Sequence, residues 1–448
     1  MTIKKLRNKI LDLAIHGRLV KQDANDEPAS TLLARIRQEK EQLVKDGKLK
    51  KKDLVTTPVS DEDKPFEVPE GWEWVTVKDV CQSCLGKMLD KSKNQGTPQP
   101  YLRNVNVRWG AFDLSDLLEM PFTKDEDERY SITIGDIIVC EGGEPGRCAI
   151  WNEEYSIKFQ KALHRVRCHK GIINYYITSV LEWYANSQNI EQYFTGSTIK
   201  HLTGESLNSI LIPLPPLAEQ QRIVAAVEQW MSLVDIIESG KEKLQQSIAL
   251  AKNKILDLAI KGKLVEKEGE WEEKTLASIS TDSADGPFGS NLKREHYTLN
   301  KEVRIIQLSN IGEEGWRDEN TRYTTFEHLP NIARSEVHPG DIVIAKMMPA
   351  GRAILCPSDD KKYVLSSDAV KFVLKENVYD KYVLNAINSS YFREQVYDDV
   401  QGVTRVRTSL KKLREYTIPL PPLSEQQRIV AKIEELFAQL DIISNALK

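Results

Sequence analysis

The longest regular pattern of apolar positions in the chain runs from Ile212 to Val265. After three closely spaced prolines, apolar residues recur at alternating steps of four and three positions, with Lys241 as a polar exception. They are Ile223, Val227, Trp230, Val234, Ile237, Leu244, Ile248, Ala251, Ile255 and Leu258. This spacing is the a/d seam of a coiled coil, and it predicts one continuous helix that Gly262 ends. At about 1.5 Å per residue, about 45 helical residues form a rod about 70 Å long, which is more than a globular core needs.

Two fragments elsewhere in the chain repeat the two halves of this helix. Ile418–Ile443 matches Ile212–Ile237 at 17 of 26 positions, and Asn8–Val20 matches Asn253–Val265 at 11 of 13. Because both fragments carry the same apolar seam, they predict a second, split helix that lies antiparallel to the first under approximate two-fold symmetry. The residues expected to pair the helices are Ile223, Val227, Val234, Ile237, Ile248 and Ile255, with Ile429, Ile433, Leu436, Leu440, Ile3, Leu6 and Ile10.

Two segments with a different pattern lie between these helices. From about residue 66 to residue 211, short alternating segments separated by turns are typical of an α+β domain, with a helix over Asn174–Asn189 and a last strand over Leu207–Ile212. The plan returns later, where GDIVIAKMMPAGRAIL from Gly340 repeats GDIIVCEGGEPGRCAI from Gly135. We predict an α+β fold, with two pseudo-two-fold-related α/β domains separated by a pair of long antiparallel coiled-coil helices.

The predicted boundaries follow from these repeats. They are 1–20 for the first fragment of the split helix, 21–64 for a helical insertion and linker, 65–212 and 266–418 for the two α+β domains, 213–265 for the central helix and 419–448 for the last fragment. The insertion has no counterpart after Val265. Asp26 and Pro28 open its helix, and the basic tract Lys48–Lys52 either is solvated or contacts DNA or a partner.

Composition narrows the class of protein. Hydrophobic residues at 40% and charged residues at 29% describe a soluble globular chain, and no apolar run approaches the length of a membrane span. The N-terminal segment reads as a charged helix and not as a signal peptide, so we expect a cytoplasmic protein. A net charge of -4 argues against a strongly basic, free-standing DNA binder, so any nucleic acid would be held by local basic surface, with help from a partner.

Sequence motifs for catalysis are missing. The chain has no GxxxxGK[ST] loop, no NPPY-type loop for an extruded adenine, no glycine-rich loop for S-adenosylmethionine and no HExxH pair, so we expect no catalytic residues. Cys81 and Cys84 form a CxxC pair, but Ser280 and Ser283 stand at the equivalent places in the second half. We therefore expect reduced thiols and no metal site.

Two basic tracts, one in each domain, have the character of a nucleic-acid surface. Arginine can pair with guanine O6 and N7, lysine mostly anchors phosphate, and asparagine can reach adenine edges, although it more often forms turns. Phosphate positioning is favoured over base reading for the Arg405 and Arg407 loop. The DNA-binding candidates are Lys161, Arg165, Arg167, Ser197, Thr198, Lys200 and His201 in the first domain, Thr404, Arg405, Arg407, Lys411 and Lys412 in the second, and Asn104 and Asn310.

The repeated motif IPLPPLxEQQRIV, which opens a long helix after each of two divergent α+β domains, resembles the specificity subunit of a type I restriction-modification enzyme. The resemblance implies two target recognition domains that each read half of a split double-stranded DNA site. It also implies that the paired helices dock two methyltransferase subunits and, through them, restriction subunits. Cofactors would then belong to those partners, as S-adenosylmethionine, ATP and Mg²⁺, with none in this chain. The insertion departs from this pattern.

Two other functions stay open at this point. One is a coiled-coil scaffold with two protein-binding domains, and the other is a self-contained DNA methyltransferase. The missing catalytic motifs argue against the methyltransferase, and the divergent loops on a repeated frame favour sequence reading over scaffolding.

Overall fold

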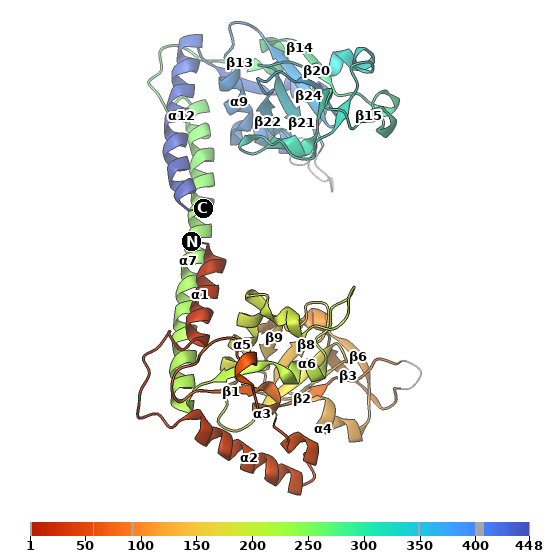
Figure 1. Cartoon of the computed structure of the whole chain (residues 1–448). Coiled ribbons are helices and arrows are strands. Elements are labelled where there is room, and N and C mark those ends of the chain that lie inside the picture. Colours follow the sequence, from red (N-terminus) through yellow and green to blue (C-terminus); the bar gives the residue numbers. More distant parts are fainter. Residues whose placement is uncertain (1, 57, 91–93, 348–349, 399–406, 448) are drawn as a thin grey trace. The chain divides into compact units, whose positions relative to one another are not determined.

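The computed structural model describes residues 2–56, 58–90, 94–347, 350–398 and 407–447. The chain divides into two compact units, Met1–Ser239 and Gly240–Lys448. Each unit holds a mixed α/β domain and part of the long helix α7 (Leu217–Ile260), which lies between the two domains in the chain (Figure 1). These elements confirm the predicted fold class of two α/β domains with a long helix between them.

In the first unit, α1 (Ile3–Ile15) lies antiparallel to the first half of α7. The Arg7 guanidinium pairs with Asp235 and, at 2.9 Å, with Glu238, whereas the Gln22 amide donates to Glu219. Residue 7 thus lies beside residues 235 and 238, whereas residue 22, which follows α1, lies beside residue 219 at the start of α7. The two helices therefore run in opposite directions. Apolar positions close this contact, with Ile10, Ile223, Val227 and Val234 buried and Ile3 and Leu6 partly buried.

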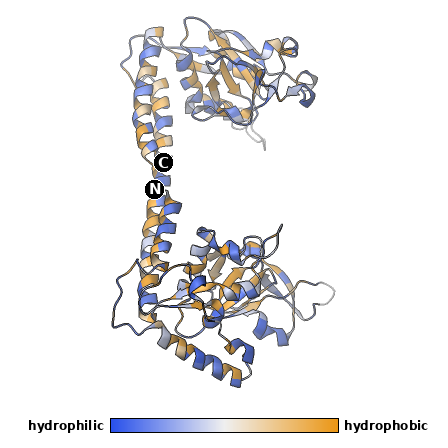
Figure 2. Ribbon diagram, in the orientation of Figure 1, coloured by the Kyte–Doolittle hydropathy of each residue, from blue (hydrophilic) through white to orange (hydrophobic). Residues whose placement is uncertain are grey.

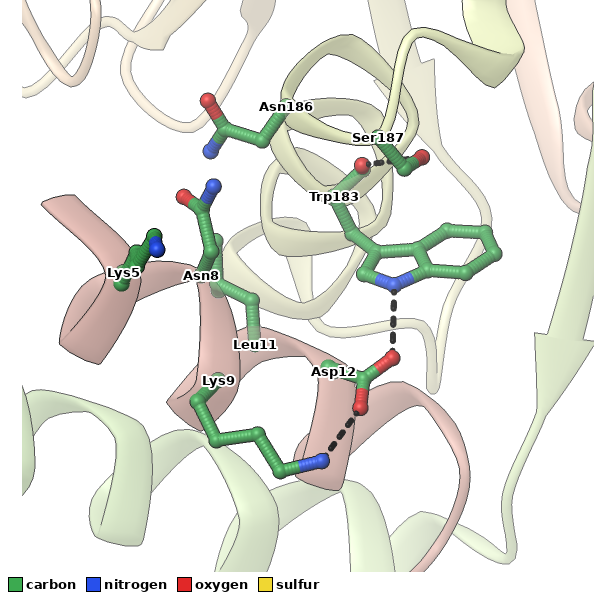
Figure 3. A pocket seen from close by; sticks show the side chains of 8 residues that line it. All are labelled: Lys5, Asn8, Lys9, Leu11, Asp12, Trp183, Asn186 and Ser187. Atoms are coloured by element: carbon green, nitrogen blue, oxygen red, sulfur yellow. Dashed lines mark hydrogen bonds and ion pairs between the residues drawn. The ribbon is translucent and has the colours of Figure 1, made fainter. Parts of the chain in front are cut away.

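Helix α1 also packs against the domain of its own unit. Figure 3 shows Trp183 of α5 (Asn174–Asn186) pointing its indole nitrogen at Asp12 of α1, with Nε1 3.4 Å from Oδ1. Lys9 bonds the other carboxylate oxygen of Asp12 at 2.9 Å. The N-terminal helix therefore holds the domain and α7 together.

In the second unit, a different helix packs against α7. Here α12 (Leu423–Ala446) runs antiparallel to the second half of α7, with Lys252 bonded to Asp441 at 2.6 Å. Ile248, Ile429 and Ile433 are buried, and Ile255, Leu436 and Leu440 are partly buried.

Ile237 corrects the predicted seam, because its side chain is 53% exposed. After Val234, the face of α7 that meets α1 passes to the half-exposed Glu238 and not to Ile237, and Glu238 pairs with Arg7. Likewise Met231, and not the half-exposed Trp230, packs against the core. A straight α-helix repeats every 3.6 residues, so its buried face drifts from a strict 3.5-residue seam.

Two four-stranded sheets build the domain of the first unit, with order β2-β11-β8-β9 in one and β6-β3-β10-β7 in the other. Two-stranded pairs β1-β12 and β4-β5 complete it. The strands are β1 (Glu73–Thr76), β2 (Cys81–Leu85), β3 (Thr97–Leu102), β4 (Val107–Arg108), β5 (Ala111–Phe112), β6 (Leu118–Phe122), β7 (Ser131–Ile132), β8 (Ile137–Cys140), β9 (Cys148–Ile150), β10 (Ile157–Phe159), β11 (Leu163–Cys168) and β12 (Leu211–Leu214). Short helices α3 (Val77–Val80), α4 (Asp127–Tyr130) and α6 (Gly204–Ser209) connect them.

Strand β8 explains the layering of this domain. All four of its residues are buried, and successive side chains point to opposite faces of the sheet. Ile137 and Val139 join the core beneath α5, while Ile138 and Cys140 join the core shared with the second sheet. The central sheet is therefore covered on both faces, and the apolar strands stand out in Figure 2.

The domain of the second unit repeats this arrangement, with sheets β14-β24-β21-β22 and β15-β19-β16-β23-β20 and pairs β13-β25 and β17-β18. Its strands are β13 (Glu272–Thr275), β14 (Ser280–Asp285), β15 (Tyr297–Thr298), β16 (Val303–Ile306), β17 (Ile311–Gly312), β18 (Gly315–Trp316), β19 (Tyr323–Thr324), β20 (Glu336–Val337), β21 (Ile342–Ala345), β22 (Ala353–Leu355), β23 (Lys362–Leu365), β24 (Ala369–Leu374) and β25 (Thr417–Leu420). Its helices are α8 (Leu276–Ile279), α9 (Asp380–Asn388), α10 (Ser390–Asp398) and α11 (Leu410–Glu415).

The strand predicted over Leu207–Ile212 is wrong in its first half, because Thr203 caps a short helix, α6, that ends at Ser209. Strand β12 then runs to Leu214 and includes Pro213. Proline fits there because β12 belongs to a two-stranded sheet, whose outer edge needs no N–H donor.

Each domain joins its helix through the repeated IPLPPLxEQQ motif, at a joint that we call the elbow. In the first unit, the Trp72 indole donates to the Glu219 carboxylate at 2.8 Å, and the Gln220 amide oxygen accepts from the Ile173 N–H at 3.1 Å. The Tyr176 hydroxyl donates to the Pro213 carbonyl. Glu219 and Gln220 are both buried, so these polar contacts are isolated from water.

The second unit forms an equivalent elbow. Trp271 donates to Glu425 at 3.1 Å, the Tyr379 N–H donates to Gln426 at 2.9 Å, and the Tyr382 hydroxyl donates to the Pro419 carbonyl at 2.7 Å. The motif therefore does more than start a helix, because it fixes each domain to the helix that follows it.

Replacing Trp72 with phenylalanine tests the elbow. The substitution keeps an aromatic ring but leaves the buried Glu219 carboxylate without its indole donor, so we expect a loss of about 1–3 kcal/mol in the free energy of unfolding. Trp109→Phe is a matched control, because the Trp109 indole donates to Glu144 at an exposed site where water replaces the bond. That control should change stability by less than about 0.5 kcal/mol in urea denaturation. Equal effects of the two substitutions would contradict the role of the elbow.

Candidate nucleic-acid interface

Three loops meet at one edge of the domain in the first unit. They are the turn Asn104–Asn106, the segment 141–147 after β8, and the hairpin 195–201. The Asn104 amide donates to the Gly142 carbonyl at 3.2 Å, and the Leu202 N–H donates to the Glu141 carbonyl at 2.8 Å. Strands of the frame end here, so the loops are supported by a rigid sheet.

The hairpin 195–201 presents the most accessible of the predicted DNA-binding residues. Backbone bonds of 2.9 Å in both directions between Thr195 and His201 close it. Ser197, Thr198 and Lys200 are exposed, His201 is half-buried, and Lys200 pairs with Glu191 at 2.7 Å. The tip also carries Ile199, which is 66% exposed and which the sequence analysis missed. Such a tip can offer hydroxyl, cationic and apolar groups to a groove.

Lys161 lies beside the same edge. Its side chain is exposed, and the next residue, Ala162, accepts a backbone bond from Glu141 at 2.9 Å. The structure therefore brings Lys161 close to the start of the segment 141–147.

The second unit builds the equivalent edge from the turn Leu308–Asn310, the segment after β21 and the segment leading to α11. The Thr408 N–H donates to the Lys346 carbonyl at 2.8 Å, and Arg407 forms a β-bridge with Met347. Arg407 is exposed, as is Lys411 of α11, and Lys412 is half-buried. Thr404 and Arg405 lie outside the described residues.

Arg165, a predicted DNA-binding residue, has a buried side chain in this structure. Its guanidinium donates to the carbonyls of Ser131 and Glu128, at 2.5 and 3.3 Å, and burial lowers its pKa. In the second domain Lys371 has the same place and bonds the Glu336 carbonyl at 2.6 Å. A cation at this position therefore holds the edge strand β7 or β20 to the central sheet.

Arg167 is also largely committed to the fold. It forms two bonds of 2.7 Å to the buried carboxylate of Asp136, and these bonds raise its pKa. A buried carboxylate without a partner is unfavourable, so Asp136 needs the positive charge of Arg167. The Arg167 guanidinium is therefore less available for contact with DNA.

Asn310 is another correction, since its side chain is completely buried. Its amide oxygen accepts from the Gln307 N–H at 2.9 Å, and its amide nitrogen donates to the carbonyls of Arg317 and Glu319. Asn106 makes the equivalent contacts in the first domain. Asn104 is half-buried, with its amide turned to Gly142. These side chains hold the turns through bonds within the domain.

Repetition between the two halves of the sequence was the signal that could have distinguished these structural residues from residues available to contact DNA. Asn106 and Asn310 occupy equivalent places, and so do Arg147 and Arg352, whose guanidinium groups bond the carbonyls of Asn104 and Ile311 at 2.9 Å. Residue types that recur in both domains belong to the frame, whereas the segment that forms the hairpin 195–201 differs in sequence from its counterpart in the second half.

Within the described ranges, no group of three or more histidine, cysteine or acidic side chains is placed to hold a metal ion. The Cys81 and Cys168 sulfurs lie 3.3 Å apart on neighbouring strands, and this contact and burial raise the pKa of Cys81. Among the residues that the structure describes, no helix is long and apolar enough to cross a membrane.

A family model for the type I restriction modification DNA specificity domain matches the chain twice, at residues 69–246 and 270–448. The chain belongs to this family. It is 28% identical to the type I restriction enzyme EcoAI specificity subunit of Escherichia coli and 25% identical to the EcoEI specificity subunit, with 100% of this chain and 91% of each relative covered. It is thus a non-catalytic specificity subunit with two DNA specificity domains.

Two solved structures share the fold of this specificity subunit. The first, from work on complex assembly and conformational transition of the type I restriction-modification system, has a TM-score of 0.64, 19% identity, and coverage of 86% of this chain and 94% of that chain. The HsdS subunit from Thermoanaerobacter tengcongensis has a TM-score of 0.51 and 19% identity, with 86% and 93% covered.

Two alanine substitutions test whether a residue belongs to the frame of a specificity domain or to its exposed surface. Asn310→Ala leaves one buried N–H and two carbonyls without partners, so we expect a loss of about 1–3 kcal/mol of stability. Ser197→Ala, at the exposed hairpin tip, should change stability by less than about 0.5 kcal/mol. Thermal denaturation measures both. A stable Asn310→Ala protein with altered DNA reading would restore the sequence-based assignment of Asn310.

Proposed function

We propose that the two specificity domains read different halves of one asymmetric, two-part DNA site. The observation that carries this is the contrast between frame and loops. The two-sheet frame, the elbow and the turn-holding residues recur in both domains, whereas the corresponding segments of the sequence read GSTIKHLT in one half and GVTRVRTS in the other. Equivalent frames that carry different side chains suit two readers of different sequence.

The length of α7 limits the gap between the half-sites. Its 44 residues, at about 1.5 Å each, make about 66 Å of helix. At about 3.4 Å per base pair, this length corresponds to at most about 20 base pairs between the half-sites. The recognised site should therefore contain an unspecified gap well below that limit.

The helices also offer a surface for partner subunits. In the first unit, Trp230, Leu233 and Ile236 of α7 are 49%, 43% and 65% exposed, although they lie on a long ordered helix. Exposed apolar side chains that cluster in this way are typical of protein interaction sites. We infer that the helices dock two methyltransferase subunits, and through them restriction subunits, and that those partners use S-adenosylmethionine, ATP and Mg²⁺.

The DNA modified by the complex provides the main test. Single-molecule sequencing of DNA from cells that carry this chain with its methyltransferase partner should show one methylated adenine in each half of an asymmetric two-part site, on opposite strands. The purified chain alone should methylate nothing, which distinguishes it from a self-contained methyltransferase. A continuous palindrome, or complete absence of modification in the presence of the partner, would overturn the proposal; in the second case the scaffold function would be favoured.

Arg407 allows a test of reading by the second domain. Arg407→Ala should weaken or relax recognition of the second half-site by about 1–3 kcal/mol if the guanidinium pairs with guanine. Arg407→Lys separates the two modes of contact, because it keeps a phosphate anchor but loses the bidentate fork. Binding to duplexes with single substitutions in each half-site measures the effect. A change confined to the first half-site would contradict this placement.

A further inference from the structure

The insertion of residues 21–64 is firmly attached to the first domain. Leu32 and Ile36 of α2 (Ala29–Lys45) belong to the buried core of the first unit, and Lys40 donates to the Lys78 carbonyl at 3.0 Å. Glu39 bonds His169 at 3.0 Å. The helix is therefore part of the domain surface (Figure 1).

The end of this insertion helix carries a dense group of lysines that we call the lysine tract. Its members are Lys45, Lys48, Lys50, Lys51 and Lys52. The backbone of the tract is fixed, because Asp53 accepts the Lys50 N–H at 3.0 Å and Lys78 donates to the carbonyls of Lys52 and Val55 at 3.3 and 3.1 Å. The five side chains consequently project from a defined surface.

Among the described residues, these five lysines have no carboxylate partner, unlike three other lysines of the domain. All five are exposed, and none forms an ion pair with a residue in the described ranges. By contrast, Lys87, Lys158 and Lys200 pair with carboxylates at 2.6, 2.6 and 2.7 Å. Of the acids beside the tract, Asp46 accepts from the Gln42 amide and Asp53 binds backbone. Concentrated positive charge of this kind fits a polyanion.

Lysine chemistry favours DNA backbone over a protein surface. Ammonium groups on flexible stems suit phosphate oxygens, whereas the cores of protein interfaces are enriched in arginine and aromatic residues and depleted in lysine. The lysine tract contains neither arginine nor an aromatic residue. Resting on the DNA-reading role proposed above, we propose that the lysine tract is a sequence-independent phosphate-binding surface that adds DNA backbone contacts to the first specificity domain.

The sequence after Val265 lacks a counterpart of the insertion, so the lysine tract belongs to the first half of the chain. The helix that carries the tract is bonded at the Cys168 end of β11, whereas the loops of the reading edge lie at its Leu163 end, so the additional contacts would fall on DNA that flanks the first half-site and not the second. They would raise affinity for every sequence equally and leave the identity of the recognised site unchanged.

Charge removal in the intact complex tests this surface. The variant Lys48→Gln/Lys50→Gln/Lys51→Gln/Lys52→Gln is compared with the charge-keeping control in which the same four lysines become arginine. Each is purified with the methyltransferase partner and titrated against two 60-base-pair duplexes, one of random sequence and one with the methylated site, over a range of salt concentrations. At about 0.9 per phosphate contact, the slope of log K against log salt should become shallower by about 2–4 in the glutamine variant.

We expect the glutamine variant to bind both duplexes at least 10-fold more weakly at 0.15 M salt, while the arginine control binds like the wild type and the methylated sequence stays the same. Unchanged affinity and slope would overturn the proposal. So would loss of the methyltransferase subunit from the glutamine complex, because the tract would then bind a protein. If the wild-type complex itself does not prefer the methylated duplex, the DNA-reading role fails, whereas weaker random-duplex binding by the glutamine variant would still support the phosphate surface.

Discussion

A buried carboxylate bonded to an indole fixes each specificity domain on its helix. Glu219 is held by Trp72 and Glu425 by Trp271, and both carboxylates are buried. Burial raises the pKa of Glu219, although the indole bond acts in the opposite direction. A carboxylate that is so poorly solvated needs its hydrogen-bond donor, because losing the bond would leave a buried polar group without a partner. This requirement fixes the position of the indole. The neighbouring glutamine and tyrosine contacts then determine the direction in which the domain leaves the helix.

In each domain, the residues that stabilise the fold differ from the exposed residues that are available for recognition. The sandwich is stabilised by apolar strands covered on both faces and by polar side chains, such as Asn106 and Arg147, that tie the turns to the sheet. The hairpin 195–201 adds almost nothing to this core, because its tip is exposed. Recognition residues can therefore vary widely while the frame stays intact.

The sequence predicted the architecture well because periodicity and repetition are visible without a structure. The long helix α7, the two α/β domains and the insertion follow from the order of apolar residues and from the two internal matches, although Trp230 and Ile237 fall outside the buried face of the helix. The elbow was missed, because its partners Trp72 and Glu219 are 147 positions apart and the motif reads simply as the start of a helix. Site residues were harder still: an arginine that neutralises Asp136 and an arginine that reads guanine look the same in one sequence. Only the structure shows that Arg167 is paired with the buried Asp136.

The elbow also bears on how such a gene changes. Both joints use the same set of contacts: an indole, a glutamate, a glutamine and a tyrosine in equivalent positions. The motif side of each joint is nearly the same sequence, so a domain exchanged at the motif would meet the same partner residues. A crossover there would bring in a foreign domain that still carries its own tryptophan and tyrosine and therefore seats correctly. New specificities would then arise by exchange of whole cassettes, in a single genetic event, without any intermediate that fails to fold.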